Sequence, residues 1–383
     1  MADPALAATS NTLFNIAFVT YIVATVAYFL ALAAKRFSVE GLPEATATAR
    51  RAELGGTFIA CAGLAVHATS VLTRGLASGR VPWANMYEYS SAMALLVVVA
   101  GLVVVQRRYG YGELMGFVLA GAVLMMTSAI LLFAEAGPVV PALDTYWIKI
   151  HTSAAMAASS IFIVGFAATA LYLIKDVAER RVTRTSSFGG STVGAGAVAL
   201  PPSTTERPEG YVDDAGAALR IASPQAQRDT LSPLLFPLVP FLVVGLFTLA
   251  VWRTPTGAFA AASVAALLGT ASWYAVPYLP PAAHLDALAY RTIAFAFPVW
   301  TFAVIAGAIW AEEAWGRYWG WDPKETGSFF TWVLYAAYLH ARSTRGWRGP
   351  RAAWTAVGAF AALMVTYYAV NLFIVGLHSY ADV

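Results

Sequence analysis

Apolar runs of about twenty residues recur along most of the chain, and they constrain its fold more than any other feature of the sequence. A run of this length is what an α-helix needs to cross the hydrocarbon core of a bilayer. Because lipid offers the backbone no hydrogen-bond partners, such segments form helices. Of the 383 residues, 59% are hydrophobic and 12% are charged, about half the charged fraction of a soluble domain. We therefore predict an all-α polytopic membrane protein.

Ten apolar segments are predicted to be transmembrane helices. The ninth is short, and the Asp-Pro-Lys-Glu turn before it indicates an earlier start. The seventh ends near Pro277 and Pro280. The predicted spans are 13–34, 54–72, 87–105, 113–133, 148–174, 233–251, 258–279, 292–311, 327–341 and 353–376.

Basic residues in the loops predict the orientation, because cytoplasmic loops carry an excess of Lys and Arg. With the N-terminus outside, the short inner loops hold eleven basic residues and the outer side holds six. The long loop after the fifth span adds seven on the inside. We therefore predict about ten transmembrane helices with the N-terminus outside.

One segment breaks the series of spans. Residues 183–230 are rich in Ser, Thr, Gly, Pro and Ala and show no apolar period, which is typical of a flexible linker. We predict a front five-helix half at 1–175, a cytoplasmic linker at 176–231 and a back five-helix half at 232–383.

Several chemistries find no support in the sequence. The net charge of +3 does not indicate nucleic acid as a partner, and neither a phosphate-binding loop nor an HExxH motif occurs. Cys61 is the only cysteine, so the chain has no internal disulfide and no CxxC pair. We expect Cys61 to be buried within the second span, where it is a poor nucleophile.

The densest chemical signal is a tryptophan segment between the eighth and ninth spans. It contains Trp315, Trp319 and Trp321 within seven residues, and Asp322-Pro323-Lys324-Glu325 follows as a helix N-terminus signature. Asp322 is thus predicted to cap the ninth helix. The tryptophans have two interpretations: an interfacial belt, or a stacking platform for a flat apolar ring system. The two are compatible, since a capped helix fixes the angle of a platform.

Two histidines are predicted at the same depth as the tryptophan segment. His151 begins the fifth span and His378 follows the tenth, so both fall on the outer side. Two neutral imidazoles can ligate a haem iron from opposite faces. For either histidine alone, a solvated interfacial position is the competing interpretation.

The other three histidines have different settings. His340 ends the ninth span on the inner side, His284 is in an inner loop, and His67 lies deep in the second span. For His340 the competing interpretations are an inner ligand and an interfacial histidine. For His67 and His284 they are an inner ligand and a structural residue, and we favour the structural one. In the outer loop before the third span, Arg74 and Arg80 suit either carboxylates of a ligand or a pair with Glu88.

These motifs resemble those of a known family. Residues 315–326 read WGRYWGWDPKET and look like the WWD signature of haem-handling proteins, continued by Tyr338-Leu339-His340-Ala341-Arg342. The segments around His151 and His378 resemble the two flanking histidine motifs, and residues 80–88 resemble the front-half loop. Within that superfamily the chain resembles CcsA, also called ResC, of the system II pathway of cytochrome c maturation.

The resemblance implies a function. Such proteins move haem b outward and, with a CcsB (ResB) partner, present it to apocytochrome c with a CxxCH motif, as half of a two-protein synthase. It implies His151 and His378 as axial ligands of an outer haem on the extracytoplasmic face, with Trp315, Trp319, Trp321 and Asp322 as its cradle. It implies His340 as one ligand of an inner haem. A partner histidine, His67 or His284 remains open as the other.

Three alternatives stay open at the level of sequence. One is a system I haem handler resembling CcmC or CcmF, another is a haem transporter without ligation chemistry, and the third is a structural subunit of a respiratory complex.

Overall fold

The fold was obtained as a computed structural model. It describes residues 3–37, 43–137, 144–189, 227–228, 230–252, 254–344, 347, 349–374 and 376–377. Its helices are α1 (Pro4–Ala33), α2 (Ala47–Ser78), α3 (Met86–Ala100), η1 (Gly101–Arg108), η2 (Gly112–Leu114), α4 (Met115–Leu131), α5 (Tyr146–Gly189), α8 (Leu235–Trp252), α9 (Pro255–Ala275), η4 (Val276–Tyr278), α10 (Ala282–Trp315), α11 (Pro323–Ser343), α12 (Pro350–Met364), η5 (Val365–Val370) and α13 (Asn371–Phe373).

The predicted all-α membrane fold is confirmed. Within the described ranges, eight helical stretches are long and apolar enough to cross a membrane. The shorter α8 and the capped α11 fill the positions of the sixth and ninth predicted spans. α11 begins at Pro323, so the earlier start suggested by its cap is correct. The only strands among the described residues are β1 (Arg36–Phe37) and β2 (Pro43–Glu44), a short antiparallel pair in the turn after α1.

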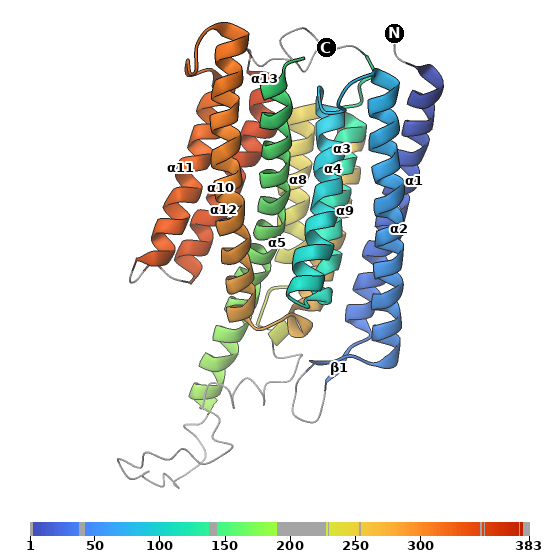
Figure 1. Cartoon of the computed structure of the whole chain (residues 1–383). Helices are drawn as coiled ribbons and strands as arrows, with labels where there is room; N and C mark the ends of the chain where they lie inside the picture. Colours follow the sequence, from blue (N-terminus) through green and yellow to red (C-terminus); the bar gives the residue numbers. More distant parts are fainter. Residues whose placement is uncertain are drawn as a thin grey trace.

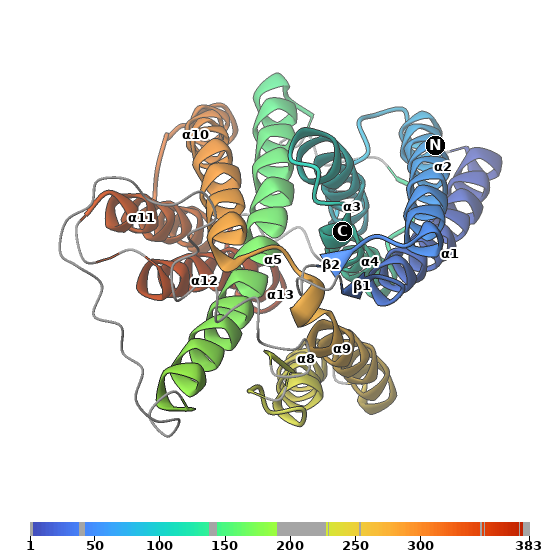
Figure 2. The same cartoon turned by 90° about the horizontal axis from the view of Figure 1, so that it is seen from below.

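The helices form an upright bundle in which neighbours in sequence pair as antiparallel hairpins (Figure 1). α1 packs along α2, α3 along α4, α8 along α9 and α11 along α12. The exception is α5, which packs along α10 at the centre and so joins the front and back parts of the chain (Figure 2).

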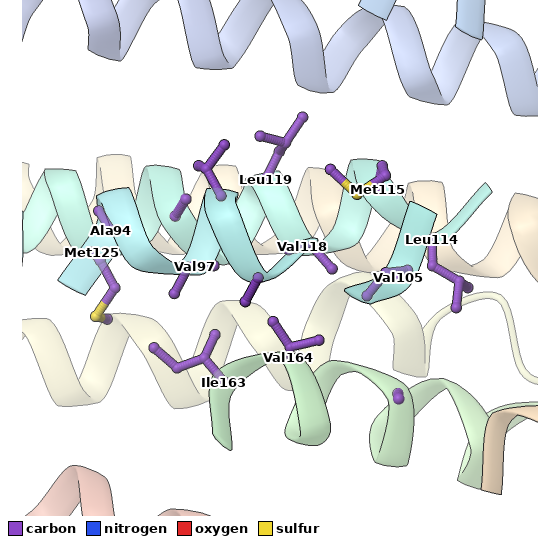
Figure 3. Packing of buried hydrophobic residues seen from close by; sticks show 14 of the residues in the cluster. Ala94, Val97, Val105, Leu114, Met115, Val118, Leu119, Met125, Ile163 and Val164 are labelled. Atoms are coloured by element: carbon purple, nitrogen blue, oxygen red, sulfur yellow. The ribbon is translucent and has the colours of Figure 1, made fainter. Parts of the chain in front are cut away.

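The largest core among the described residues runs from α1 through α3 and α4 to α5 and α10. Val97, Val118, Leu119 and Val164 are almost completely buried, and in Figure 3 Val164 of α5 points towards α3 and α4, whereas Leu119 points to the opposite side. Close packing of this kind holds helices together in lipid, where apolar surface alone gives no preference for a neighbouring helix over a lipid chain. The bundle therefore has a rigid centre on which the site is built.

One expectation about the second span is wrong. Cys61 is exposed on α2, not buried. α2 turns one face to α1 through small residues such as Ala60, and the next residue along a helix points about 100° away. An apolar span therefore has an outward face as well as a packed one, and Cys61 lies on the outward face.

The fifth helix is longer than its apolar run. α5 continues to Gly189, beyond the predicted end of the span at 174 and beyond the predicted start of the linker at 176. Residues 190–226, the greater part of that linker, lie outside the described residues.

Three features gather at one end of the bundle: the start of α1, the loop between α10 and α11, and α13 (Figure 1). The β1–β2 turn lies at the opposite end, together with the start of α10 and the end of α11. Charged and aromatic residues predicted to act together are thus collected at the first of these ends.

Candidate functional site

The tryptophan segment is a tight connection between two helices. α10 ends at Trp315, and Gly316 follows with φ of 69°, donating its N–H to the Glu312 carbonyl at 2.8 Å. Glycine adopts this left-handed conformation without steric cost, and such a residue commonly ends a helix. The predicted cap of the next helix is confirmed, because Asp322 and Glu325 form a capping box at the start of α11.

Glu325 also holds the loop itself. Its Oε2 accepts hydrogen bonds from the backbone N–H groups of Asp322 at 3.1 Å and Gly320 at 2.8 Å. Arg317 lies 3.8 Å from the same oxygen. One nearly buried carboxylate therefore fixes both ends of the turn that carries Trp319 and Trp321.

The three predicted tryptophans occupy different environments. Trp319 lines the cavity described below, whereas Trp321 is 63% exposed and has a strained φ of 58°. Their rings meet edge to face, with centroids 5.7 Å apart. Trp315 meets Trp310 at 4.8 Å, also edge to face. The segment is thus an angled cluster of rings and not one flat stack.

His151 is held by α10 in a defined tautomer. Its Nδ1 lies 2.7 Å from the Ala303 carbonyl oxygen, which accepts hydrogen bonds and cannot donate them. Nδ1 therefore carries the proton, and the lone pair of Nε2 is left to bind a metal, as in many histidine-ligated metal sites.

The rest of α10 shapes the space around this imidazole. Trp310, 1% exposed, lies nearly parallel to the His151 ring, with an interplanar angle of 9° and centroids 6.4 Å apart. Gly307 leaves room for the ring, since a Cβ there would lie 2.7 Å from it. Ala303, Gly307 and Trp310 follow the spacing of one helix face. Sequence reasoning missed this face, although its periodicity runs directly into the tryptophan segment.

A cavity of about 190 Å³ lies beside His151. Its wall is mostly apolar and comes from both halves of the chain, as is usual for a site that binds a small organic ligand. Its residues include Trp83, Asn85 and Tyr89 from the front half, His151 and Thr152 from α5, Trp300 and Trp310 from α10, Trp319, Lys324 and Ser328 from the turn and α11, and Tyr367 and Asn371 near the chain end.

Ion pairs between charged side chains hold the loop before α3 in place. Glu88 is buried and accepts hydrogen bonds from Arg74 Nε at 2.9 Å and from Arg80 Nη1 at 2.7 Å. The two arginines also donate to the carbonyls of Ala134 and Gly137. Of the two interpretations given above, the pair with Glu88 is the one observed, while Arg80 still contributes to the cavity wall.

Lys324 brings a further positive charge to the cavity. Burial lowers the pKa of the Lys324 ammonium to about 8, and the nearby Asp322 carboxylate acts in the opposite direction.

The second predicted outer ligand, His378, lies outside the described residues. The residue before it is described: the Leu377 N–H donates to Asp322 Oδ1 at 2.8 Å. The end of the chain therefore meets the tryptophan segment at its cap residue.

The remaining histidines lie away from this cavity. His340 is exposed in the last turn of α11, and His284 is exposed in the first turn of α10. Asp286 and Arg342 join these helix ends by an ion pair of 2.6 Å. Because residues two apart on a helix point about 200° from each other, a contact between Asp286 and Arg342 turns His284 and His340 away from one another.

His67 is fully buried between α1, α2 and α3. Its ring nitrogens lie 3.0 Å from Ser91 Oγ and 3.4 Å from Tyr21 Oη. These contacts give both nitrogens a polar neighbour within the protein core.

Comparison with known proteins places the chain in a family. The family model described as "Cytochrome C assembly protein" matches residues 83–378. The chain is 34% identical to the cytochrome c biogenesis protein CcsA of Gloeobacter violaceus, over 96% of this chain and 94% of that protein. It is 33% identical to CcsA of a Picosynechococcus species, over 85% and 87%. It is 31% identical to CcsA of a Nostoc species, over 98% of each. The chain therefore belongs to the CcsA family of cytochrome c biogenesis proteins.

Proposed function

We propose that this protein holds haem b at the outer face of the bacterial inner membrane and presents it to apocytochrome c for covalent attachment. The relatives are named as cytochrome c biogenesis proteins, which supports the pathway. The observation that carries the haem site is the tautomer of His151, whose Nε2 is free to bind iron at the edge of an apolar cavity. His378 supplies the second axial ligand.

The charges around the cavity suit a porphyrin that bears carboxylates. The apolar wall with Trp319 accepts the flat ring system, and Lys324 offers a cation for a propionate. Arg80 is engaged by Glu88, so it serves the ligand less directly. Trp321 and Tyr318 of the tryptophan segment have exposed rings, which a partner can contact.

The addition that forms the thioethers is itself redox-neutral and takes place on ferrous haem. Each cysteine S–H of the CxxCH motif adds across one vinyl C=C bond of haem: a C–S bond forms, the thiol hydrogen passes to the other vinyl carbon, and no electrons are gained or lost. The histidine of the same motif replaces one axial ligand. The contribution of this chain is to position the reactants, which removes a large entropic cost. In this sense the chain is one half of a synthase.

The second half is a CcsB-type membrane protein. His340, at the end opposite to the cavity, is exposed on α11 and so accessible to a neighbouring chain. We assign it to an inner haem whose other ligand comes from that partner. His67 is buried, and His284 points away from His340, so both are less suitable than a partner histidine as the other ligand of this inner haem. The bias of basic residues towards the opposite end supports the outer position of the His151 cavity.

A visible spectrum tests this function. We expect the protein, purified with a CcsB-type partner, to show a six-coordinate bis-histidine haem spectrum. His151→Gly and His378→Gly should each lose it together with cytochrome c maturation, and added imidazole should restore both. Ser153→Gly is the matched control: it places a glycine in the same turn of α5 but outside the cavity wall. Normal maturation by the double histidine variant without imidazole would contradict the proposal and favour a haem transporter without ligation chemistry.

A further inference from the structure

Only one of the two carboxylate oxygens of Glu325 holds the tryptophan turn. Oε2 accepts the N–H groups of Gly320 and Asp322, and Arg317 lies 3.8 Å from the same oxygen. Oε1 is buried and has no hydrogen-bond partner within the described part of the chain. The residue is 7% exposed, so bulk water supplies little of the missing bond. A buried acceptor left in this state costs free energy, and its presence in a folded protein calls for an explanation.

The explanation lies in the position of the side chain. Glu325 lines the cavity beside His151. Because Oε2 is turned to the loop backbone, Oε1 is the oxygen that remains for a molecule entering the cavity. Such a molecule must carry a hydrogen-bond donor, since a carboxylate only accepts.

Of the two reactants in the proposed function, haem does not supply this donor. Its ring edge and vinyl groups are apolar, and its ionised propionates are acceptors. The CxxCH segment of the apocytochrome does supply donors, namely two thiols and an imidazole N–H. The thiol is the donor that gives up its hydrogen in the reaction, because the thiolate is the nucleophilic form of cysteine. A carboxylate within hydrogen-bond reach of the S–H group can take that proton.

We propose that Glu325 is a catalytic residue for thioether formation: Oε1 accepts the S–H group of a substrate cysteine and removes its proton. The thiolate sulfur then forms a C–S bond with one vinyl carbon while the π bond breaks. The electron pair on the other vinyl carbon takes the proton back from Glu325, so the carboxylate is regenerated and no electrons are gained or lost. The inference rests on the proposed function and extends it.

One conservative variant separates this role from the hold on the turn. Glutamine is the other residue that completes a capping box at this position. In Glu325→Gln the single side-chain oxygen can still accept the loop N–H groups, but the amide that replaces Oε1 donates hydrogen bonds and takes no proton. Arg317→Gln removes the cation beside Oε2 and leaves the carboxylate in place. Glu313→Gln is the matched control, because it makes the same change at an exposed carboxylate near the end of α10.

The assay uses the protein purified with its CcsB-type partner and its haem, reduced with dithionite. A synthetic peptide with one CxxCH motif is added, and two steps are followed. The visible spectrum reports replacement of an axial ligand by the peptide histidine, and mass spectrometry reports the haem-linked peptide.

We expect Glu325→Gln to keep the haem spectrum, the ligand replacement and the unfolding midpoint in detergent. Thioether formation should be about 100-fold slower at pH 7, the smaller end of what general acid–base catalysis contributes. Its rate should recover as the pH approaches about 8.5, the usual pKa of a free thiol, because solvent then generates the thiolate. Arg317→Gln and Glu313→Gln should stay close to the wild type.

Each other outcome overturns a distinct statement. A wild-type rate for Glu325→Gln at every pH would end the catalytic role and leave the haem site intact. If Glu325→Gln and Arg317→Gln lower the unfolding midpoint equally and slow the reaction equally, the two residues are a structural ion pair and the inference fails. If Glu325→Gln impairs the ligand replacement, Glu325 serves the peptide imidazole and the thiol assignment is wrong. If the wild-type complex lacks a bis-histidine spectrum, the proposed function fails independently of Glu325.

Discussion

A single backbone carbonyl decides what His151 can do. The Ala303 oxygen fixes the proton on Nδ1 and leaves Nε2 with a free lone pair, the atom that we propose binds iron. Trp310 and Gly307 then determine where the ring lies. Ligand strength at this position depends on the shape of the α10 face as well as on the presence of a histidine.

Gly307→Ala tests that statement at the residue scale. A new Cβ would lie 2.7 Å from the imidazole, so the ring must move from its present position. We expect the bis-histidine spectrum to weaken and free imidazole to compensate in part. Gly358→Ala is the control, because a Cβ there meets nothing within 4 Å and alanine favours a helix. Equal spectra for the two variants would show that the close contact is irrelevant to ligation.

Local pattern predicted the parts of the site that are local in sequence. The predicted cap formed by Asp322 and Glu325 is confirmed. It could be predicted because a capping box depends on only four consecutive residues. The contact between His151 and Ala303 spans 152 residues, and the contact between Leu377 and Asp322 spans 55. Such pairs depend on how helices are arranged in space, and no local period indicates them.

At the scale of elements, the transmembrane spans were predictable because few backbone structures other than a helix satisfy their hydrogen bonds in lipid. All ten predicted spans fall on helices of the structure. Their ends were less predictable, as α5 shows by continuing to Gly189 in polar sequence. Hydropathy reports where a helix meets lipid, whereas backbone hydrogen bonding lets it extend beyond the bilayer.

The loop before α3 is stabilised by the ion pairs of Glu88 with two arginines. Glu88→Gln keeps the shape of the side chain but leaves Arg74 and Arg80 without their buried counter-charge. Removing one partner from a buried ion pair costs about 3–5 kcal/mol of unfolding free energy. We expect a correspondingly lower unfolding midpoint in detergent, measured against Glu135→Gln, an exposed carboxylate in the connection after α4. An unchanged midpoint for Glu88→Gln would mean that the cluster does not order this loop.

At the scale of the whole molecule, the site depends on α5 and α10 lying side by side. This pairing joins the front and back parts of the chain, so that the cavity takes Trp83 and Tyr89 from one and Trp319 from the other. The histidines at 340 and 151 belong to opposite ends of the bundle. A haem that visits both must travel along the length of the helices, and the orientation of the bundle then decides the direction of transport.

That orientation is open to direct measurement, because Cys61→Ser removes the only cysteine. In that background, Asp3→Cys tests the end that holds the cavity, and Ser203→Cys tests the predicted cytoplasmic linker. The excess of basic residues away from the cavity predicts that the first lies outside and the second inside. A membrane-impermeant thiol reagent added to intact cells should label position 3 and spare position 203, and permeabilised cells should be labelled at both, which controls for reactivity. Labelling of position 203 alone in intact cells would show the opposite orientation, with the His151 cavity on the cytoplasmic side. Apocytochrome c outside the membrane could then not receive haem at that cavity.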